Sequence, residues 1–344
     1  MAKAKILLSG GMGYIGSHTV VELLQQGYKV IIADNLSTSS AEVLPAIEEI
    51  TQKKPVFEKV DLADEQACKA FFEKYQGIDA IIHFAAHKAV NESVELPLKY
   101  YKNNLFSMVN ILQNMEKHRI NHLVFSSSCT VYGQPESLPV KEDTPVQKAE
   151  NPYGNTKQIC EEMIQDTCVA TAFQSISLRY FNPIGAHESA KIGELPIGIP
   201  NNLIPYITQT AIGKRECLSI YGNDYNTKDG TAIRDYIHVV DLAKAHIIAI
   251  ERLLQKKNKT NFEVFNLGTG KGYTVLDAVK SFEKVSGQKL NYQFAPRRKG
   301  DIEKIWADTS YANSELEWKA EKDLDEMLST AWEWEKNLSK KEEQ

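Results

Sequence analysis

Short apolar runs alternate with longer amphipathic segments through the first half of the chain. A short apolar run next to a segment of helical periodicity predicts a strand next to a helix. Repeated alternation of this kind favours a parallel sheet with helices on both faces, so we predict an α/β fold with a Rossmann-type, doubly wound parallel sheet. The runs are Lys5–Ser9, Val30–Ala33, Val56–Val60, Ala80–Phe84 and His122–Ser126. Small or polar residues close each run, and ligands of such sheets bind at the carboxyl ends of the strands.

The pattern changes in the second half of the chain. Prolines and glycines are frequent from residue 183 to residue 235, and we predict a loop-rich segment there. The other expected elements are helices at 91–117, 152–172, 274–286 and 324–335, strands at 175–180, 262–267 and 290–294, and a strand leading into a helix at 236–253. Residues 339–344 are polar, and we expect them to fray.

A glycine-rich turn follows the first run, with Gly10, Gly13 and Gly16 in the spacing G-x-x-G-x-x-G. Such glycines let the backbone approach a pyrophosphate at the positive end of the next helix, although they can also form a purely structural turn. Asp34 closes the second run, where a carboxylate accepts hydrogen bonds from ribose hydroxyls and repels a 2′-phosphate. Residues 30–40 contain no arginine or lysine, which favours NAD over NADP. Asp61 is either an adenine contact or a helix cap.

The glycine turn places a dinucleotide site in the first half of the chain, and the loop-rich segment interrupts that half. We therefore expect two domains. Residues 1–182 with 236–268 form an NAD-binding Rossmann domain, and residues 183–235 with 269–340 form a smaller α/β substrate domain.

Tyr153 and Lys157 are four residues apart at the start of an expected helix, where they lie on the same face. Asn151 is a good N-cap and Pro152 suits the first helical position. A neighbouring ammonium favours the ionised form of a phenol, so the pair predicts an acidified tyrosine. Taken alone, the same spacing is also typical of a solvated helix face.

Composition excludes several functional classes. The formal net charge of −5 argues against general nucleic-acid binding. No apolar run reaches the roughly 18 residues of a membrane span, and the first strand begins too early to leave room for a signal peptide. Five scattered cysteines without C-x-x-C spacing indicate reduced thiols in a cytoplasmic protein. No motif for a metal site is present.

Three features together resemble the extended short-chain dehydrogenase/reductase family: the glycine turn, the serines Ser126–Ser128, and Tyr153-x-x-x-Lys157. Longer runs along the whole chain are similar to the UDP-glucose 4-epimerase branch of that family. These runs are GGMGYIGSHT (10–19), DNLS (34–37), HFAAHKAVNES (83–93), FSSSCTVYG (125–133), NPYGNTK (151–157), LRYFNPIGAH (178–187), GIPNNLIPYI (198–207), GTAIRDYIHVVDLA (230–243) and RRKGDIEKIWAD (297–308).

The resemblance implies an isomerase that interconverts UDP-glucose and UDP-galactose. A tightly bound NAD, regenerated at each turnover, oxidises the sugar at carbon 4; the 4-keto sugar rotates and is reduced on its other face. Tyr153, Lys157 and Ser128 are the implied catalytic residues. The implied cofactor contacts are Gly10, Gly13, Tyr14, Ile15, Gly16, Asp34, Asn35, Leu36, Ser37, Asp61, Leu62, Phe84, Ala85, Ala86, His87, Lys88, Asn103, Ser128, Tyr153, Lys157 and Phe181. The implied substrate contacts are Lys88, Ser128, Tyr153, Asn182, Asn202, Leu203, Ser219, Ile220, Tyr221, Arg234, Arg298, Asp301 and Ile305.

The resemblance also addresses the alternatives. Sugar 4,6-dehydratases carry an Asp–Glu pair where this chain has Cys129 and Thr130, so dehydration is not expected. Ile305 stands where a bulky tyrosine goes with plain hexoses, and its middling size implies a side activity on UDP-N-acetylglucosamine and UDP-N-acetylgalactosamine. A UDP-uronate epimerase or decarboxylase and a catalytically inactive NAD-sensing member remain as rivals. The long helices at 91–117 and 152–172 imply a homodimer.

Overall fold

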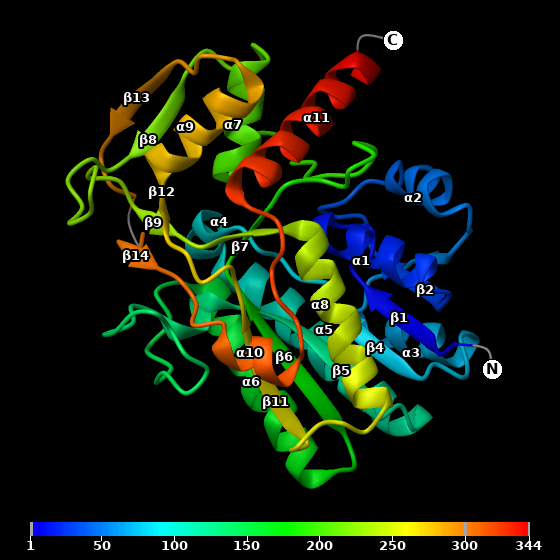
Figure 1. Ribbon diagram of the computed structural model, residues 1–344. Helices are drawn as coiled ribbons and strands as arrows, with labels where there is room; N and C mark the ends of the chain where they lie inside the picture. The colour runs from blue at the N-terminus through cyan, green and yellow to red at the C-terminus, as the bar shows by residue number, and fades with distance from the viewer. Residues whose placement is uncertain (1–2, 299–300, 343–344) are drawn as a thin grey trace.

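A seven-stranded parallel sheet forms the centre of the molecule (Figure 1). The computed structural model describes residues 3–298 and 301–342. The strand order is β11-β6-β5-β4-β1-β2-β3, and every neighbouring pair runs parallel. The strands are β1 Lys5–Ser9, β2 Lys29–Asp34, β3 Val56–Lys59, β4 Ala80–His83, β5 His122–Ser128, β6 Gln174–Tyr180 and β11 Phe262–Leu267. The predicted α/β class with a doubly wound sheet is confirmed.

Helices cover both faces of this sheet and create two hydrophobic cores. One face carries α1 Tyr14–Gln25, α2 Val43–Thr51 and α8 Val239–Leu254; the other carries α3 Glu65–Lys74, α5 Pro97–His118 and α6 Pro152–Ala170. Alternate residues of one strand enter opposite cores, as Ile6 and Leu8 do on one side and Leu7 on the other. Because both faces are buried, the strands are continuous apolar runs rather than alternating patterns.

The helix predicted at 91–117 is in fact two helices, α4 Val90–Glu95 and α5 Pro97–His118. The break falls at Leu96, whose φ of −127° and ψ of 58° are not helical. Pro97 causes it, since a proline disfavours helical geometry in the preceding residue and cannot donate a backbone hydrogen bond. The prediction of one continuous helix was therefore wrong.

A smaller α/β unit lies over the carboxyl edge of the sheet, at the top of Figure 1. Its elements are β7 Asn182–Ile184, α7 Leu203–Ala211, β8 Leu218–Tyr221, β9 Ile233–Arg234, β10 Tyr236–His238, β12 Tyr273–Thr274, α9 Val275–Ser286, β13 Tyr292–Ala295, β14 Lys304–Ile305 and α11 Leu324–Glu342. The helices α7, α9 and α11 share a third hydrophobic core with β8 and β10. Strand β13 pairs with β8, and β12, β9 and β14 form a small three-stranded sheet.

The segment predicted as loop-rich, residues 183–235, is mostly loop, and it also contains α7, β8 and β9. Pro205 is compatible with α7 because it falls in the first turn, where a proline removes no intrahelical hydrogen bond. One sequence prediction in this region was wrong. The end of the chain does not fray at residue 339, since α11 continues to Glu342; residues 343 and 344 lie outside the described residues. Glu335 in its middle is buried and pairs with Lys214, which ties this helix to the segment after α7.

One further short helix, α10 Ser310–Glu315, packs against the first unit rather than the second. Ala312, Leu316 and Trp318 join the core beneath α8, and the Trp318 indole donates to the Asp241 carbonyl oxygen at 3.0 Å. The two-domain division stays a prediction. Residues 310–318 were assigned to the second domain, but they pack against the core of the first. Among the described residues, no helix is long and apolar enough to cross a membrane.

Candidate active site

Residues from the carboxyl edge of the large sheet and from the smaller unit line a cleft of about 1600 Å³. Every candidate site residue predicted from the sequence lines this cleft except Leu36. The Leu36 side chain packs instead against the core beside β2. Residues from distant parts of the sequence, such as Gly10, Tyr153 and Arg298, therefore surround a single space.

The glycine turn builds one end of the cleft. Gly10 has a φ of +73°, and a Cβ there would lie 2.7 Å from the backbone nitrogen of Ala85. A Cβ on Gly16 would clash with the Gly10 carbonyl oxygen, so a side chain at either position would fill the space beside the turn. Gly13 caps α1 without a side-chain hydrogen bond, which leaves the first N–H groups of the helix for an anion. This cradle fits the pyrophosphate of a dinucleotide.

Asp34 organises the adenosine end of the same cradle. Its Oδ2 accepts from the Met12 N–H at 3.0 Å, and its Oδ1 accepts from the Leu36 N–H at 2.9 Å and from Ser39 Oγ at 2.8 Å. The carboxylate thus holds the glycine turn and the loop after β2 together while it lines the cleft. An anion in this place fits the free ribose hydroxyls of NAD and disfavours a 2′-phosphate.

Lys157 belongs to α6 and is a buried part of the cleft lining. The helix begins as predicted, with the Asn151 side chain accepting from the Gly154 N–H at 2.9 Å and Pro152 in the first position. Lys157 is 4% exposed, and its Nζ donates to the Ser126 carbonyl oxygen at 2.6 Å. Burial lowers the pKa of Lys157 to about 8, against the opposing effects of Cys160 and Glu161.

The environment of Tyr153 corrects one expectation. Although part of its ring faces the cleft, the protein around it desolvates the hydroxyl and raises the pKa of Tyr153 to about 12. The Ser128 hydroxyl acts in the opposite direction and is the second largest influence. Lys157 Nζ lies 5.9 Å from the centre of the Tyr153 ring and is bonded elsewhere. The Tyr–Lys spacing alone therefore does not make this tyrosine acidic.

Two arginines reach the other end of the cleft from the smaller unit. The Arg234 guanidinium lies 3.8 Å from the Asp301 carboxylate, and that of Arg298 lies 3.9 Å from the centre of the Tyr221 ring. Arg297, the neighbour of Arg298, instead pairs with Asp224 on the surface. Arg234 and Arg298 are therefore candidates to bind a diphosphate, since guanidinium groups bind phosphate oxygens bidentately.

Sequence reasoning missed Glu194, which lies between two predicted residues at the cleft. Its Oε1 accepts from Asn202 Nδ2 at 2.6 Å and lies 3.3 Å from Lys88 Nζ, while Trp334 Nε1 donates to its backbone oxygen at 2.9 Å. A lone glutamate in a segment rich in proline and glycine has no sequence signal of its own. Its partner Lys88 comes from the loop after β4, more than a hundred residues away.

Comparison with known proteins agrees with this geometry. A family model described as GDP-mannose 4,6 dehydratase matches residues 7–331. The UDP-glucose 4-epimerase of Bacillus subtilis is 53% identical over 330 residues, which cover 96% of each chain. The crystal structure of UDP-glucose 4-epimerase from Bifidobacterium longum in complex with NAD+ and UDP has a TM-score of 0.93 at 45% identity, covering 97% of this chain and 98% of that chain. The structure of the UDP-Glc/GlcNAc 4-epimerase from Campylobacter jejuni has a TM-score of 0.83 at 38% identity, covering 97% and 99%.

The fold, the glycine cradle and the Tyr–Lys pair define an enzyme of the extended short-chain dehydrogenase/reductase class. The positions after Ser128 are Cys129 and Thr130, without the carboxylates that a dehydratase would need. Within the class, the chain belongs to the UDP-glucose 4-epimerase family.

Proposed function

We propose that this protein interconverts UDP-glucose and UDP-galactose through a 4-keto sugar. One observation carries the proposal: Tyr153 and Lys157 lie in one cleft between the NAD-type cradle at Asp34 and the Arg234–Arg298 pair. The cradle fits NAD, and the arginines fit a UDP-sugar. The B. longum relative was crystallised with NAD+ and UDP, which supports both assignments.

The chain's own residues supply binding and proton transfer. NAD, when bound, supplies the oxidation and re-reduction at carbon 4 of the sugar. The Tyr153 oxygen takes the proton of the 4-hydroxyl and later returns it. Ser128 hydrogen-bonds the same sugar oxygen. Arg234 and Arg298 hold the diphosphate, so that the hexose can rotate about its link to the phosphate while the nucleotide stays in place.

A coupled assay tests this function. Purified protein should convert UDP-galactose to UDP-glucose without added NAD, and its absorbance spectrum should show a bound nicotinamide nucleotide. Tyr153→Phe should lower kcat by about a thousandfold or more, because it removes the proton acceptor. It should keep the bound nucleotide. A protein that carries the nucleotide but leaves UDP-galactose unchanged would refute the proposal and point to an NAD-binding relative without this activity.

We further propose a side activity on UDP-N-acetylated sugars. Ile305 is 2% exposed in β14 and packs near Phe181 and Val131 at the cleft. A tyrosine there would take up space beside the sugar that isoleucine leaves open. The C. jejuni relative named UDP-Glc/GlcNAc 4-epimerase supports this proposal. Rates with UDP-N-acetylglucosamine should be measurable and should fall in Ile305→Tyr, whereas UDP-galactose turnover is retained. Inertness of the unsubstituted protein toward the N-acetyl sugar would contradict it.

A homodimer is the assembly that we propose, formed by α5 and α6. Large apolar side chains remain exposed along these two helices, namely Leu98 at 79%, Phe106 at 52% and Val169 at 83%. A large exposed apolar patch is typical of a protein–protein interface, and we propose that these side chains contribute to one. Sedimentation should give twice the monomer mass, and Phe106→Glu should produce monomers.

We also propose a cytoplasmic location, in keeping with five free cysteines.

A further inference from the structure

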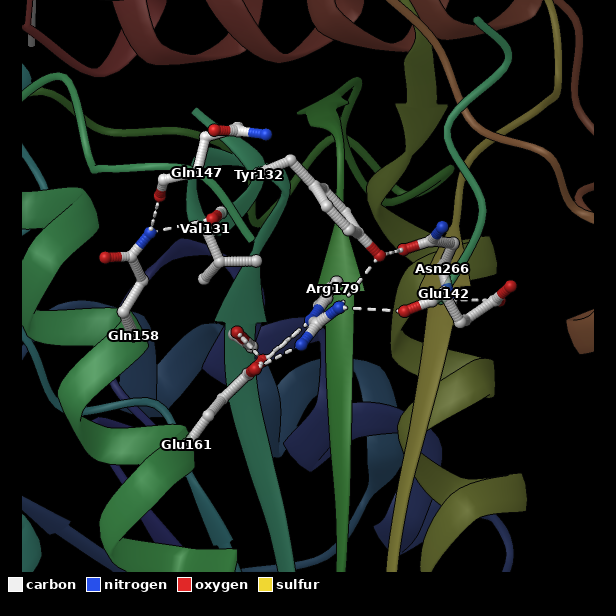
Figure 2. Close-up of polar contacts among 9 residues, drawn as sticks. Val131, Tyr132, Glu142, Gln147, Gln158, Glu161, Arg179 and Asn266 are labelled. Carbon is white, nitrogen blue, oxygen red and sulfur yellow. Dashed lines mark hydrogen bonds and ion pairs between the residues drawn. The ribbon is translucent and has the colours of Figure 1, made fainter. Parts of the chain in front are cut away.

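A buried ion pair lies directly behind the catalytic helix (Figure 2). Glu161 is one turn beyond Lys157 on α6, and Arg179 projects from β6. Arg179 Nε donates to Glu161 Oε1 at 3.0 Å, and its Nη2 donates to Oε2 at 2.5 Å. Both residues are under a tenth exposed and lie outside the set of residues that line the cleft. The pair therefore touches neither cofactor nor substrate.

The pair ties the catalytic helix to the catalytic strand. Glu161 Oε1 also accepts from Ser127 Oγ at 2.5 Å, while Lys157 Nζ donates to the Ser126 carbonyl oxygen at 2.6 Å. Two successive turns of α6 are thus fixed to two successive residues of β5. The next residue of β5 is Ser128, so these contacts set the position of Ser128 relative to Tyr153 on the first turn of α6.

The other end of the pair reaches the segment that follows Ser128. Arg179 Nη1 donates to the Tyr132 hydroxyl at 3.0 Å, and that hydroxyl donates to Asn266 Oδ1 at 2.7 Å. Tyr132 ends the short 3₁₀ helix η1 Cys129–Tyr132, which begins immediately after Ser128. Figure 2 shows Arg179 at the centre, with Glu161 on one side and Tyr132 on the other. Ser128 is therefore held from the strand before it and from the turn after it.

A buried ion pair is weak evidence for stability, because apolar side chains of the same size often replace one without loss. The contacts of this pair converge instead on the elements that carry Tyr153, Lys157 and Ser128. We propose that Glu161 and Arg179 are positioning residues that hold the proton-transfer groups of the cleft in register. The inference rests on the proposed function and deepens it, since it assigns the support of the same site.

The charge of Glu161 has a second effect on the site. The groups that face Lys157 are Tyr153, Cys160 and Glu161 on α6, His83 on β4, and the Ser126 carbonyl and the Phe125 ring on β5. The hydroxyl of Tyr180 on β6 hydrogen-bonds Ser126. Glu161 is the one carboxylate among them and raises the pKa of Lys157. Removing its charge should therefore move the alkaline limb of activity to lower pH.

The test compares two buried Arg–Glu pairs in the same protein, carrying whatever nucleotide it binds on purification. Glu161→Gln and the double variant Glu161→Gln/Arg179→Met remove the pair behind the cleft. The matched control is Arg252→Met/Glu263→Gln, a pair joining α8 to β11 with contacts of 2.7 and 2.9 Å, away from the cleft. Each variant is measured for kcat and KM with UDP-galactose, the pH profile of kcat, UDP affinity by calorimetry, and Tm.

For the Glu161 variants we expect kcat to fall roughly ten- to a hundredfold, because small displacements of reacting groups cost that much. KM and UDP affinity should stay within about twofold, because Arg234 and Arg298 are untouched. The alkaline limb should shift to lower pH. The control variant should change Tm only, with kcat and the pH profile as in the unsubstituted protein.

Folded Glu161 variants with an unchanged kcat and pH profile would overturn the proposal, as would an equal loss of kcat in the control. Should the Glu161 variants fail to fold, Ser127→Ala removes only the link between the strand and Glu161. That variant should lower kcat and leave UDP affinity unchanged, and an unaltered kcat there would equally overturn the idea. Failure of the proposed function would be distinct, because the unsubstituted protein would itself leave UDP-galactose unconverted.

Discussion

Lys157 is a buried ammonium, and its replacement by methionine should show what its burial costs. Burial lowers its pKa from 10.5 to about 8. A difference of about 2.5 in pKa corresponds to about 3.4 kcal/mol. Between these two pKa values the folded protein binds fewer protons here than the unfolded chain, so stability rises with pH in that window. The cost is fully present at pH 7 and falls to about 1.4 kcal/mol at pH 9.5.

Methionine does not titrate, so the Lys157→Met variant is the reference against which the pH dependence of the unsubstituted protein is measured. From pH 7 to pH 9.5, the free energy of unfolding of the unsubstituted protein should rise by about 2 kcal/mol relative to that of the variant. The hydrogen bond to Ser126 is stronger for the ammonium than for the neutral amine, and the pKa of Lys157 in the folded protein already contains this difference, so the comparison needs no separate correction for it. The nearest titrating neighbours lie outside the window, with the pKa of His83 at about 3 and those of Tyr153 and Cys160 at about 12.

Denaturant unfolding at the two pH values, on protein freed of bound nucleotide, measures this difference. The same variant should lose at least about a hundredfold in kcat when its nucleotide is restored, since the cation beside Tyr153 is gone. A stability difference between the two proteins that stays constant within about 0.5 kcal/mol from pH 7 to 9.5 would refute the reasoning. In that case Lys157 would be hydrated in the folded protein, and its burial would have no energetic cost.

Three other substitutions test the remaining parts of the cleft. Gly10→Ala should lower Tm and abolish nucleotide retention, because its φ of +73° and the 2.7 Å approach to the Ala85 nitrogen leave no room for a Cβ; retention of nucleotide by a folded variant would contradict the cradle. Arg298→Met should raise the KM for UDP-galactose about ten- to a hundredfold with kcat nearly unchanged, since phosphate binding is equal before and during the reaction, and an unaltered KM would remove Arg298 from the site. Asp34→Asn should weaken NAD binding and reduce the ratio of the affinities for NAD and NADP, measured by titration of nucleotide-free protein. An unchanged affinity ratio would contradict the role of Asp34.

The sequence predicted the fold well wherever local pattern and packing agree. The strands of the central sheet are buried on both faces, so each is an apolar run that stands out against the flanking helices. The failures have local causes that the pattern hides. Pro97 divides a stretch whose helical periodicity continues on both sides, and a proline-rich segment contains α7 because Pro205 falls in the first turn of that helix.

The residues of the site fall into two groups: those that belong to short sequence motifs and those whose partners are distant in sequence. The glycine turn and the Tyr153–Lys157 spacing are short motifs and could be found directly. Glu194 and Arg179 act through partners that are about a hundred and 18 residues away respectively, and no spacing marks them. Motifs identify groups that touch ligands, whereas the residues that hold those groups in place are defined only by the fold.

The pKa values of Tyr153 and Lys157 imply that these two residues of α6 have different protonation behaviour and different roles. With a pKa of about 12, Tyr153 is ionised in only about one molecule in 10⁵ at pH 7, whereas Lys157 at about 8 keeps its proton in about nine of ten. The ammonium points at the Ser126 carbonyl oxygen and the Phe125 ring rather than at the phenol. The site therefore already contains a positive charge that could favour ionisation of Tyr153, but the Lys157 ammonium that carries it contacts Ser126 and Phe125 instead. While it donates to Ser126, Lys157 does little to favour the phenolate form of Tyr153. The relative position of β5 and α6 therefore decides how far Lys157 can assist Tyr153, and Glu161, the partner of Arg179, joins those two elements.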